Sequence, residues 1–587
     1  MVKLLRDAGL YVPIRLVYEG FPATERRRYA DLREFRRSWG PMLREVKSSS
    51  ADGPIVLFPH MSVPGLYRLR IDAMLAKALA LRGCRPRFVL ERHDLWHEEY
   101  LRAMGFRDFV FIDDYLPERE PLELQARELA MVCEGLEDVL DLSYKGHEVG
   151  RHAASRTLNR LRRGFLDLRD SEVSAELRWA LTNSLVFTNA AEAIFDDVEP
   201  QRLVTSVQNY TPWAEFHEIG LRRGLDTLFW SPTHLEGTLF FRRFSYADRH
   251  EHYFTLAEET WQDLQHAPWT TEDGEAFVES MRQSYLQGTW FERKKTLRGK
   301  RLKNGEQIRA ELGLDPAKKT AFVFSHILYD ATFWYGKNLF SDFGEWLVAT
   351  VEAACANPSV NWVIKLHPAN VMLWEEATGR YSLEDVADYR LLRDRFPHLP
   401  DHVRLMPPED DTSTVSLFDF ADYALTVRGT VGLEFPCFGV PVLTGGTGGY
   451  SGRGFTIDSA TPEEYLSRLA SIQEIPRLQG EQVALAQRFS SGVFHLKPVR
   501  METFTWSLMP DEEWDMGLSA HRFELLARTA EGVRKGRDLN RFADWALDSR
   551  RRELLSVEGE ERLAPREDSM EALFALEAAE QASAVER

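Results

Sequence analysis

The chain has 587 residues, of which 44% are hydrophobic and 28% are charged, and its formal net charge is −18. A chain of this length exceeds what one hydrophobic core usually supports, so we expect at least two domains. The acidic balance argues against a broad nucleic-acid interface, which needs a basic surface to neutralise phosphates. It still allows a local basic pocket for a small anion.

The four cysteines are far apart in the sequence and form no C-x-x-C pair. Their spacing argues against a zinc site or a disulfide framework and is typical of a reducing compartment. Residues 1–20 are interrupted by charges and proline and lack the apolar core of a signal peptide. No window has the apolar length that spans a bilayer. We therefore expect a cytoplasmic protein that acts, if at a membrane, at the inner face.

The first half of the chain alternates predicted strands with predicted helices. A short apolar run predicts a strand at 54–60, and apolar residues at helical spacing predict a helix that ends near Gly83. Two more strands are expected at 86–91 and 108–113. This alternation implies parallel βαβ units. Residues 120–185 read as mostly helical, and the remaining predicted elements are strands at 184–189, 202–207 and 225–232 and a helix at 213–224.

A second alternation follows a basic segment. The predicted strands of this half lie at 320–326, 361–368, 403–408 and 440–446, with a helix and a strand within 416–427. The chain after Met509 reads as helical and ends in an acidic, alanine-rich tail. The expected domains are 1–295 on the acceptor side with a helical insertion, a linker at 296–318, a nucleotide-binding domain at 319–508, helices at 509–555 that cross back to the first domain, and a partly disordered tail at 556–587.

Polar side chains follow three predicted strands of the second half. Lys365 and His367 end one strand, and Ser325 and His326 end another, with Asp330 in the loop that follows. Ligands of open α/β sheets collect at the carboxyl ends of the strands. A lysine and a histidine at this edge suit a phosphate. The competing interpretation is a strand end that is polar by chance.

The segment after a third strand is unusually rich in glycine. Arg428, Gly429 and Thr430 lead into a predicted helix for which Thr430 is the expected N-cap, and a helix N-terminus binds anions readily. Glu434 lies about one turn further on, in reach of ribose hydroxyls. The alternative is a capped helix whose apolar residues pack in the core and whose Glu434 faces solvent. Dense glycine indicates either loop turns or backbone that approaches a ligand closely.

Several catalytic fingerprints are absent from the sequence. It has no G-x-x-x-x-G-K-[ST], no G-x-G-x-x-G after a strand, no D-x-D and no G-x-S-x-G. In the first half, His60 ends a predicted strand and Glu215 lies on a predicted helix. We take His60, Glu215 and Asp330 as catalytic candidates, although each one alone is better explained by a structural role.

Two α/β domains with nucleotide elements in the second resemble a GT-B glycosyltransferase. Within that class, "IKLHP" and "RGTVGLEFPCFGVPVLTGG" followed by "YSGRGFTIDS" resemble bacterial capsule and surface-polysaccharide biosynthesis proteins, a group that includes Kdo transferases. The resemblance is best over 320–470. It implies two Rossmann-like α/β domains that face a central cleft. The missing D-x-D fits such an enzyme, which needs no metal and no cofactor beyond its nucleotide-sugar co-substrate.

The resemblance also implies roles for individual residues. Lys365 and His367 would contact the donor phosphate, and Glu434 would bind the ribose. The expected nucleotide-binding set is Ser325, His326, Lys365, His367, Arg428, Gly429, Thr430, Glu434 and Arg453, the last in a loop over the cleft. We expect no metal ligand.

The sequence leaves three functions open. The first is a transferase that moves a sugar from a nucleotide sugar to a surface polysaccharide or glycolipid. CMP-Kdo is the favoured donor. A UDP-GlcNAc 2-epimerase or a teichoic-acid-type glycerophosphotransferase on the same scaffold is the second. The third is a non-catalytic scaffold in a polysaccharide assembly complex. The expected partners are a nucleotide sugar, a glycan or glycolipid acceptor and a membrane or assembly complex, with no nucleic acid.

Overall fold

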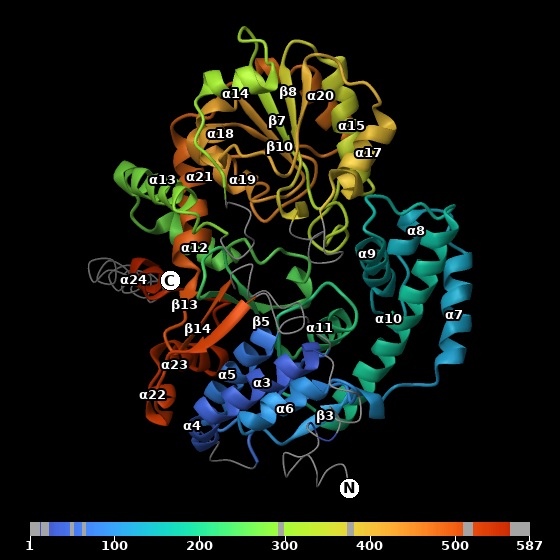
Figure 1. Cartoon of the computed structure of the whole chain (residues 1–587), viewed down its shortest axis with the longest axis vertical. Helices are drawn as coiled ribbons and strands as arrows, with labels where there is room; N and C mark the ends of the chain where they lie inside the picture. The colour runs from blue at the N-terminus through green and yellow to red at the C-terminus, as the bar shows by residue number, and fades with distance from the viewer. Residues whose placement is uncertain are drawn as a thin grey trace, which may run out of the picture.

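The computed structural model describes residues 12, 14, 23–46, 52–61, 66–291, 299–371, 381–508 and 521–563. The first part of the predicted linker and the acidic tail beyond Leu563 therefore lie outside the described residues. Two β-sheets organise this part of the chain, one at each end of the long axis (Figure 1). We call the eight-stranded sheet with its helices the first unit, and the six-stranded sheet with its helices the second unit.

The first unit contains an eight-stranded sheet in the order β13-β6-β5-β4-β1-β2-β3, with β16 also pairing with β6. Its parallel strands are β1 (Ile55–Pro59), β2 (Arg85–Leu90), β3 (Phe109–Phe111), β4 (Arg202–Thr205) and β5 (Asp226–Pro232). Its antiparallel strands are β6 (Thr238–Phe244), β13 (Val499–Arg500) and β16 (Glu553–Leu554). The parallel βαβ units expected from the sequence are confirmed.

The second unit contains a six-stranded sheet, parallel throughout, in the order β12-β11-β10-β7-β8-β9. Its strands are β7 (Thr320–Phe324), β8 (Asn361–Lys365), β9 (Val403–Met406), β10 (Tyr423–Thr426), β11 (Val442–Thr444) and β12 (Ile457–Asp458). The strand order changes direction between β10 and β8, on either side of β7. In open α/β sheets, this is where ligands bind at the carboxyl ends of the strands.

The strand predicted at 184–189 is wrong, because these residues lie inside helix α10 (Ser171–Val198). The apolar residues of this stretch belong to a helical series in which Leu177, Leu181 and Leu185 are all buried. They pack in one cluster with residues of α9 (Val149–Leu161) and α7 (Arg119–Met131). A short apolar run cannot be assigned to a strand or a helix from periodicity alone, so packing decides.

Helices α12 (Glu258–His266) and α13 (Thr271–Leu286) precede the predicted boundary at 295/296, yet they pack on the second unit. Trp261, Phe277 and Tyr285 share a hydrophobic cluster with Phe322 and Val363 of the second sheet. Burying these large aromatic side chains against the second sheet stabilises the packing of both helices on it.

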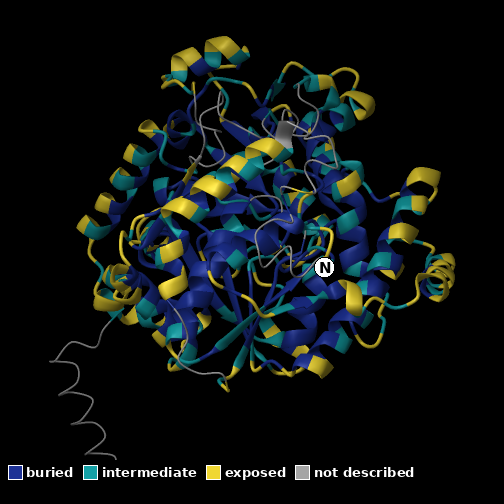
Figure 2. Ribbon diagram, turned by 60° about the horizontal axis from the view of Figure 1, so that its bottom comes forward, coloured by how far each residue is buried: buried dark blue, intermediate teal, exposed yellow. Residues whose placement is uncertain are grey.

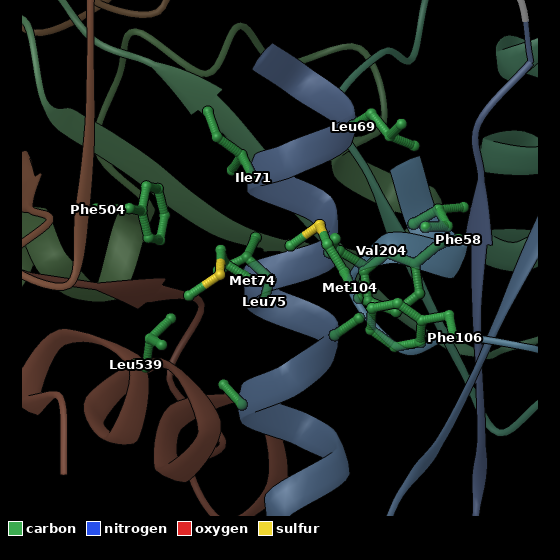
Figure 3. Close-up of a cluster of buried hydrophobic side chains, with 14 of the residues drawn as sticks. Phe58, Leu69, Ile71, Met74, Leu75, Met104, Phe106, Val204, Phe504 and Leu539 are labelled. Atoms are coloured by element: carbon green, nitrogen blue, oxygen red, sulfur yellow. The ribbon is translucent and has the colours of Figure 1, made fainter. Parts of the chain in front are cut away.

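The C-terminal segment returns to the first unit, as Figure 1 shows from the position of α22 (Ala530–Arg534) and α23 (Arg537–Leu547). The expectation of helices alone after Met509 is wrong, because β15 (His521–Leu525) pairs with β14 (Phe504–Leu508). Phe504 and Leu539 of this segment pack beside Met74 of helix α5 (Leu66–Leu81) (Figure 3). The segment thereby covers the face of α5 that the sheet does not.

Burial follows the same layers. The sheets and the inner helices are buried, and exposed residues gather on the outer helices (Figure 2). Within the described ranges, no helix has both the length and the apolar character needed to cross a membrane.

One buried ion pair joins the returning segment to the first sheet. Lys497 Nζ lies 2.6 Å from Glu553 Oε1 and donates to the carbonyls of Tyr253 and Thr255, each at 2.7 Å. Glu553 Oε2 accepts from the backbone N–H of Ala257 at 3.0 Å. Both charged side chains are fully buried.

Lys497→Met should therefore lower the free energy of unfolding by about 3–5 kcal/mol, because it leaves the Glu553 carboxylate buried without its partner. Lys535→Met is the matched control: Lys535 is 77% exposed beside Glu531, and its loss should cost about 1 kcal/mol or less. Denaturant unfolding of the three proteins followed by tryptophan fluorescence measures both. Equal stability of the two variants would contradict the importance of the pair.

Candidate functional site

A cavity of about 330 Å³ lies at the carboxyl ends of β7, β8 and β10. The second unit contributes the loops after these strands, and the segments 252–254 and 285–291 close the opposite side with aromatic side chains. Nine predicted residues line this cavity: Ser325, His326, Asp330, Lys365, His367, Arg428, Gly429, Thr430 and Glu434. Parallel strands therefore bring three separated motifs to one edge of the sheet.

Lys365 supplies a buried positive charge at the end of β8. The residue is 7% exposed, and no residue in the described part of the chain forms a hydrogen bond or ion pair with its ammonium, although the Asp410 carboxylate acts on it from beyond ion-pair distance. Burial, with a further contribution from Lys300, lowers the pKa of Lys365 to about 8. Desolvating an ammonium without a directly paired counter-charge is costly. The geometry suits an anionic ligand that offsets this cost.

Arg428 supplies a second positive charge in the loop after β10. Its Nη2 donates to Asn338 Oδ1, whereas Nε and Nη1 are buried with no hydrogen-bond partner among the residues that the structure describes. Burial lowers the pKa of the guanidinium to about 10. No carboxylate in the described ranges pairs with it. Two desolvated N–H groups beside a cavity are suited to phosphate oxygens.

His326 holds the Arg428 loop in place. Its Nε2 accepts from the backbone N–H of Val427 at 3.0 Å, so this nitrogen carries no proton. The ring packs at 4.6 Å on Phe343, and burial lowers the pKa of His326 to about 3. His326 is therefore a neutral hydrogen-bond acceptor at neutral pH and orients the loop rather than carrying charge.

Ser325 and His367 are each engaged with neighbouring groups. Ser325 Oγ donates to Asp388 Oδ2 at 2.8 Å, and burial raises the pKa of Asp388 to about 6. His367 Nδ1 accepts from the backbone N–H of Ala369 at 3.1 Å. Both residues line the cavity, but these contacts fix the ends of β7 and β8.

Glu434 is not on a solvated face. It is 2% exposed, and its Oε1 accepts from Tyr285 Oη and from Trp290 Nε1, both at 3.0 Å. Thr430 does not cap helix α19 (Val431–Glu434); its hydroxyl hydrogen-bonds to Glu434 instead. Burial raises the pKa of Glu434. The carboxylate thus ties α19 to the last turn of α13 and to the segment after it while lining the cavity.

Close packing explains most of the glycines in 429–449. A Cβ on Gly432 would lie 2.1 Å from the Tyr450 ring, and one on Gly445 would lie 2.2 Å from the Trp346 ring. Gly449 approaches Thr255, whose hydroxyl donates to the Gly449 carbonyl. These glycines let aromatic side chains and the two units approach, and Gly449, like Gly429, also lines the cavity.

Three predicted residues do not line the cavity. His60 is buried with Nδ1 2.8 Å from Asp72 Oδ2. Glu215 accepts from Ser184 and Thr211 hydroxyls in the core of the first unit, and burial raises its pKa. Arg453 forms an ion pair at 2.9 Å with Glu258.

The aromatic wall was not predicted from the sequence. Tyr253, Trp290 and Tyr450 line the cavity, and of these only Tyr450 follows a predicted strand of the second half. The density of aromatic residues in 252–254 and 290–291 was the available signal. Nothing in the local sequence indicated that these segments reach the second sheet.

No known protein family matches the chain, and no curated protein is similar to it in sequence. Solved structures similar to it include the Thermosulfurimonas dismutans KpsC beta Kdo 2,4 transferase, at 15% identity and a TM-score of 0.33, with 52% of this chain and 82% of that chain covered. The KpsC beta Kdo 2,7 transferase of the same organism has 15% sequence identity and a TM-score of 0.32, with 53% of this chain and 82% of that chain covered.

The UDP-GlcNAc 2-epimerase of Neisseria meningitidis gives 10% identity and a TM-score of 0.24, with 75% of this chain and 99% of that chain covered. With identities and TM-scores this low, the chemistry of this chain has to be argued from its own residues.

Gly432→Ala should destabilise the second unit by about 1–3 kcal/mol, because the new methyl group overlaps the Tyr450 ring. Gly135→Ala is the control, since a Cβ added there would have no atom within 4 Å. Thermal unfolding measures both variants. In a Tyr450→Ala background the effect of Gly432→Ala should disappear; an undiminished effect there would reject the steric explanation.

Proposed function

We propose that this chain is a glycosyltransferase of the GT-B type that takes its sugar from a nucleotide-sugar donor. The observation that carries the proposal is the pair of desolvated cations, Lys365 and Arg428, which form no ion pair with a carboxylate in the described residues and line one cavity. In this proposal both cations bind the donor phosphate, and the aromatic wall offers flat surfaces to a base or a sugar.

The chemistry of transfer fits these groups. When the bond between the anomeric carbon and the donor oxygen breaks, the electron pair leaves with the nucleotide phosphate. Fixed cations in a site with little water stabilise that developing charge without reorganising. Lys365 and Arg428 are placed for this role, so the proposed reaction needs no metal ion.

The favoured donor is CMP-Kdo or a related CMP-sugar, on the resemblance of the 364–368 and 428–459 segments to capsule-type proteins. The proposed acceptor is a growing surface polysaccharide or glycolipid. An enzyme with such an acceptor works on the cytoplasmic side of the inner membrane, bound at its periphery. These finer assignments rest on the resemblance rather than on the cavity.

Calorimetry with CMP, UDP and GDP tests the donor site. Lys365→Met should weaken binding of the preferred nucleotide by about 10- to 100-fold, because a charge-assisted contact of about 1.5–3 kcal/mol is lost. Lys318→Met is the control: Lys318 lies just before β7, at the opposite edge of the same sheet, beside Asp315.

Absence of binding by all three nucleotides at millimolar concentration would reject the proposal. Formation of ManNAc from UDP-GlcNAc alone would assign the epimerase reaction instead. Nucleotide binding without transfer to any glycan acceptor or to water would favour the non-catalytic scaffold.

Nucleotide affinity should also depend on pH. The pKa of Lys365 is lowered to about 8, so the ammonium is charged below pH 8 and loses its charge above it. Affinity should therefore fall about tenfold between pH 7 and pH 9.5, where the nucleotide phosphate does not change charge. Lys365→Met should flatten this dependence. An unchanged slope in that variant would show that another group titrates.

A further inference from the structure

The segment 330–336, in the loop between β7 and α15 (Phe343–Ala356), is held by the first unit. Arg151 donates to the carbonyl of Phe333 at 3.1 Å, and His250 Nδ1 lies 2.9 Å from the carbonyl oxygen of Trp334. A loop that belongs to the second sheet by sequence thus takes its conformation from the other sheet's unit.

The most specific of these contacts involves Tyr210, in the loop between β4 and α11 (Trp213–Arg222). Its hydroxyl donates to Asp330 Oδ1 at 2.7 Å and accepts from the backbone N–H of Ala331 at 2.9 Å. Ala331 has φ = +52°, in the left-handed region that non-glycine residues rarely adopt. Such a conformation persists where the surroundings impose it. One phenol therefore fixes both a carboxylate and the strained residue beside it.

Asp330 is the cavity carboxylate best placed to accept a proton. The other lining carboxylate, Glu434, is buried and already accepts hydrogen bonds from Tyr285, Trp290 and Thr430. Asp330 is exposed to the cavity, and only its Oδ1 accepts a hydrogen bond from the described part of the chain. Oδ2 is left to face a substrate.

Resting on the proposed function, we propose that Asp330 is the proton acceptor of the transfer and that Tyr210 is its positioning residue. Asp330 Oδ2 takes the proton of the acceptor hydroxyl as that oxygen forms its bond to the anomeric carbon. The bond from the anomeric carbon to the donor phosphate oxygen breaks, and its electron pair leaves with the nucleotide. Lys365 and Arg428 remain charged throughout.

The arrangement links catalysis to contact between the units. Tyr210 comes from the first unit, whereas Asp330, Lys365 and Arg428 come from the second. The cations are placed by the second sheet itself, so nucleotide binding does not depend on Tyr210. The carboxylate reaches its position only where the first unit supplies the phenol. Binding and transfer should therefore respond differently to the loss of this hydroxyl.

Tyr210→Phe tests this, because it removes the hydroxyl and keeps the ring. The assay is release of nucleotide with water as acceptor, from CMP-Kdo, UDP-GlcNAc or GDP-mannose according to the base that binds in calorimetry. We expect kcat to fall about 10- to 100-fold, as for a displaced catalytic group, and nucleotide Kd to stay within about twofold. Asp330→Asn should lower kcat by about 10²- to 10⁴-fold.

The double variant separates positioning from a general structural role. In an Asp330→Asn background, Tyr210→Phe should lower kcat no further, whereas a purely structural effect would add to it. Tyr115→Phe is the control, since it removes a tyrosine–aspartate contact, with Asp197, outside the cavity. Thermal unfolding confirms that each variant folds.

Three results would each overturn this inference. They are a wild-type kcat in Tyr210→Phe, additive losses of kcat in the double variant, and a sugar bound covalently to Asp330 in the intact-mass spectrum. The proposed function would survive those results. It fails separately if none of the three nucleotides binds.

Discussion

The cavity depends on a buried ion pair outside it. Lys497 and Glu553 come from the segment that returns to the first sheet, and Lys497 holds the carbonyls of Tyr253 and Thr255. Thr255 in turn donates a hydrogen bond to the carbonyl of Gly449, which also lines the cavity. Burying two charges is favourable only with good geometry and further hydrogen bonds, and both partners here have them. The returning segment thus connects the segment 253–255 to the glycine-rich loop of the second sheet.

A local positive site in a chain of net charge −18 has a physical consequence. Long-range attraction by the whole surface cannot concentrate an anionic ligand here, since the surface repels it. Affinity must instead come from short-range contacts with Lys365 and Arg428 in a region of low dielectric, where each contact is strong. On the proposed function, such a site would accept a small phosphate compound and discriminate against bulky polyanions.

The strand-end motifs were predictable because parallel strands bring their carboxyl ends to one edge. Lys365, Arg428 and Asp330 lie on separate segments, yet each lines the cavity, as the alternation of strands and helices implied. Ser184–Asn189 was not predictable as a helix, because a short apolar run carries both patterns and packing against α7 and α9 decides. The placement of Arg453 depended on the path of an irregular loop, which periodicity does not encode.

The contacts across the units lie beyond any single-segment pattern. Tyr210 and Asp330 are 120 residues apart, and neither neighbourhood signals the other. Local propensity even opposes the result, since Ala331 adopts a backbone conformation that alanine disfavours by about 1–2 kcal/mol. Tertiary contacts offset this conformational cost and hold the strained loop. They come from the Tyr210 hydroxyl, Arg151 and His250. Such disagreements are expected at functional or strained positions, and this one lies beside the cavity carboxylate Asp330.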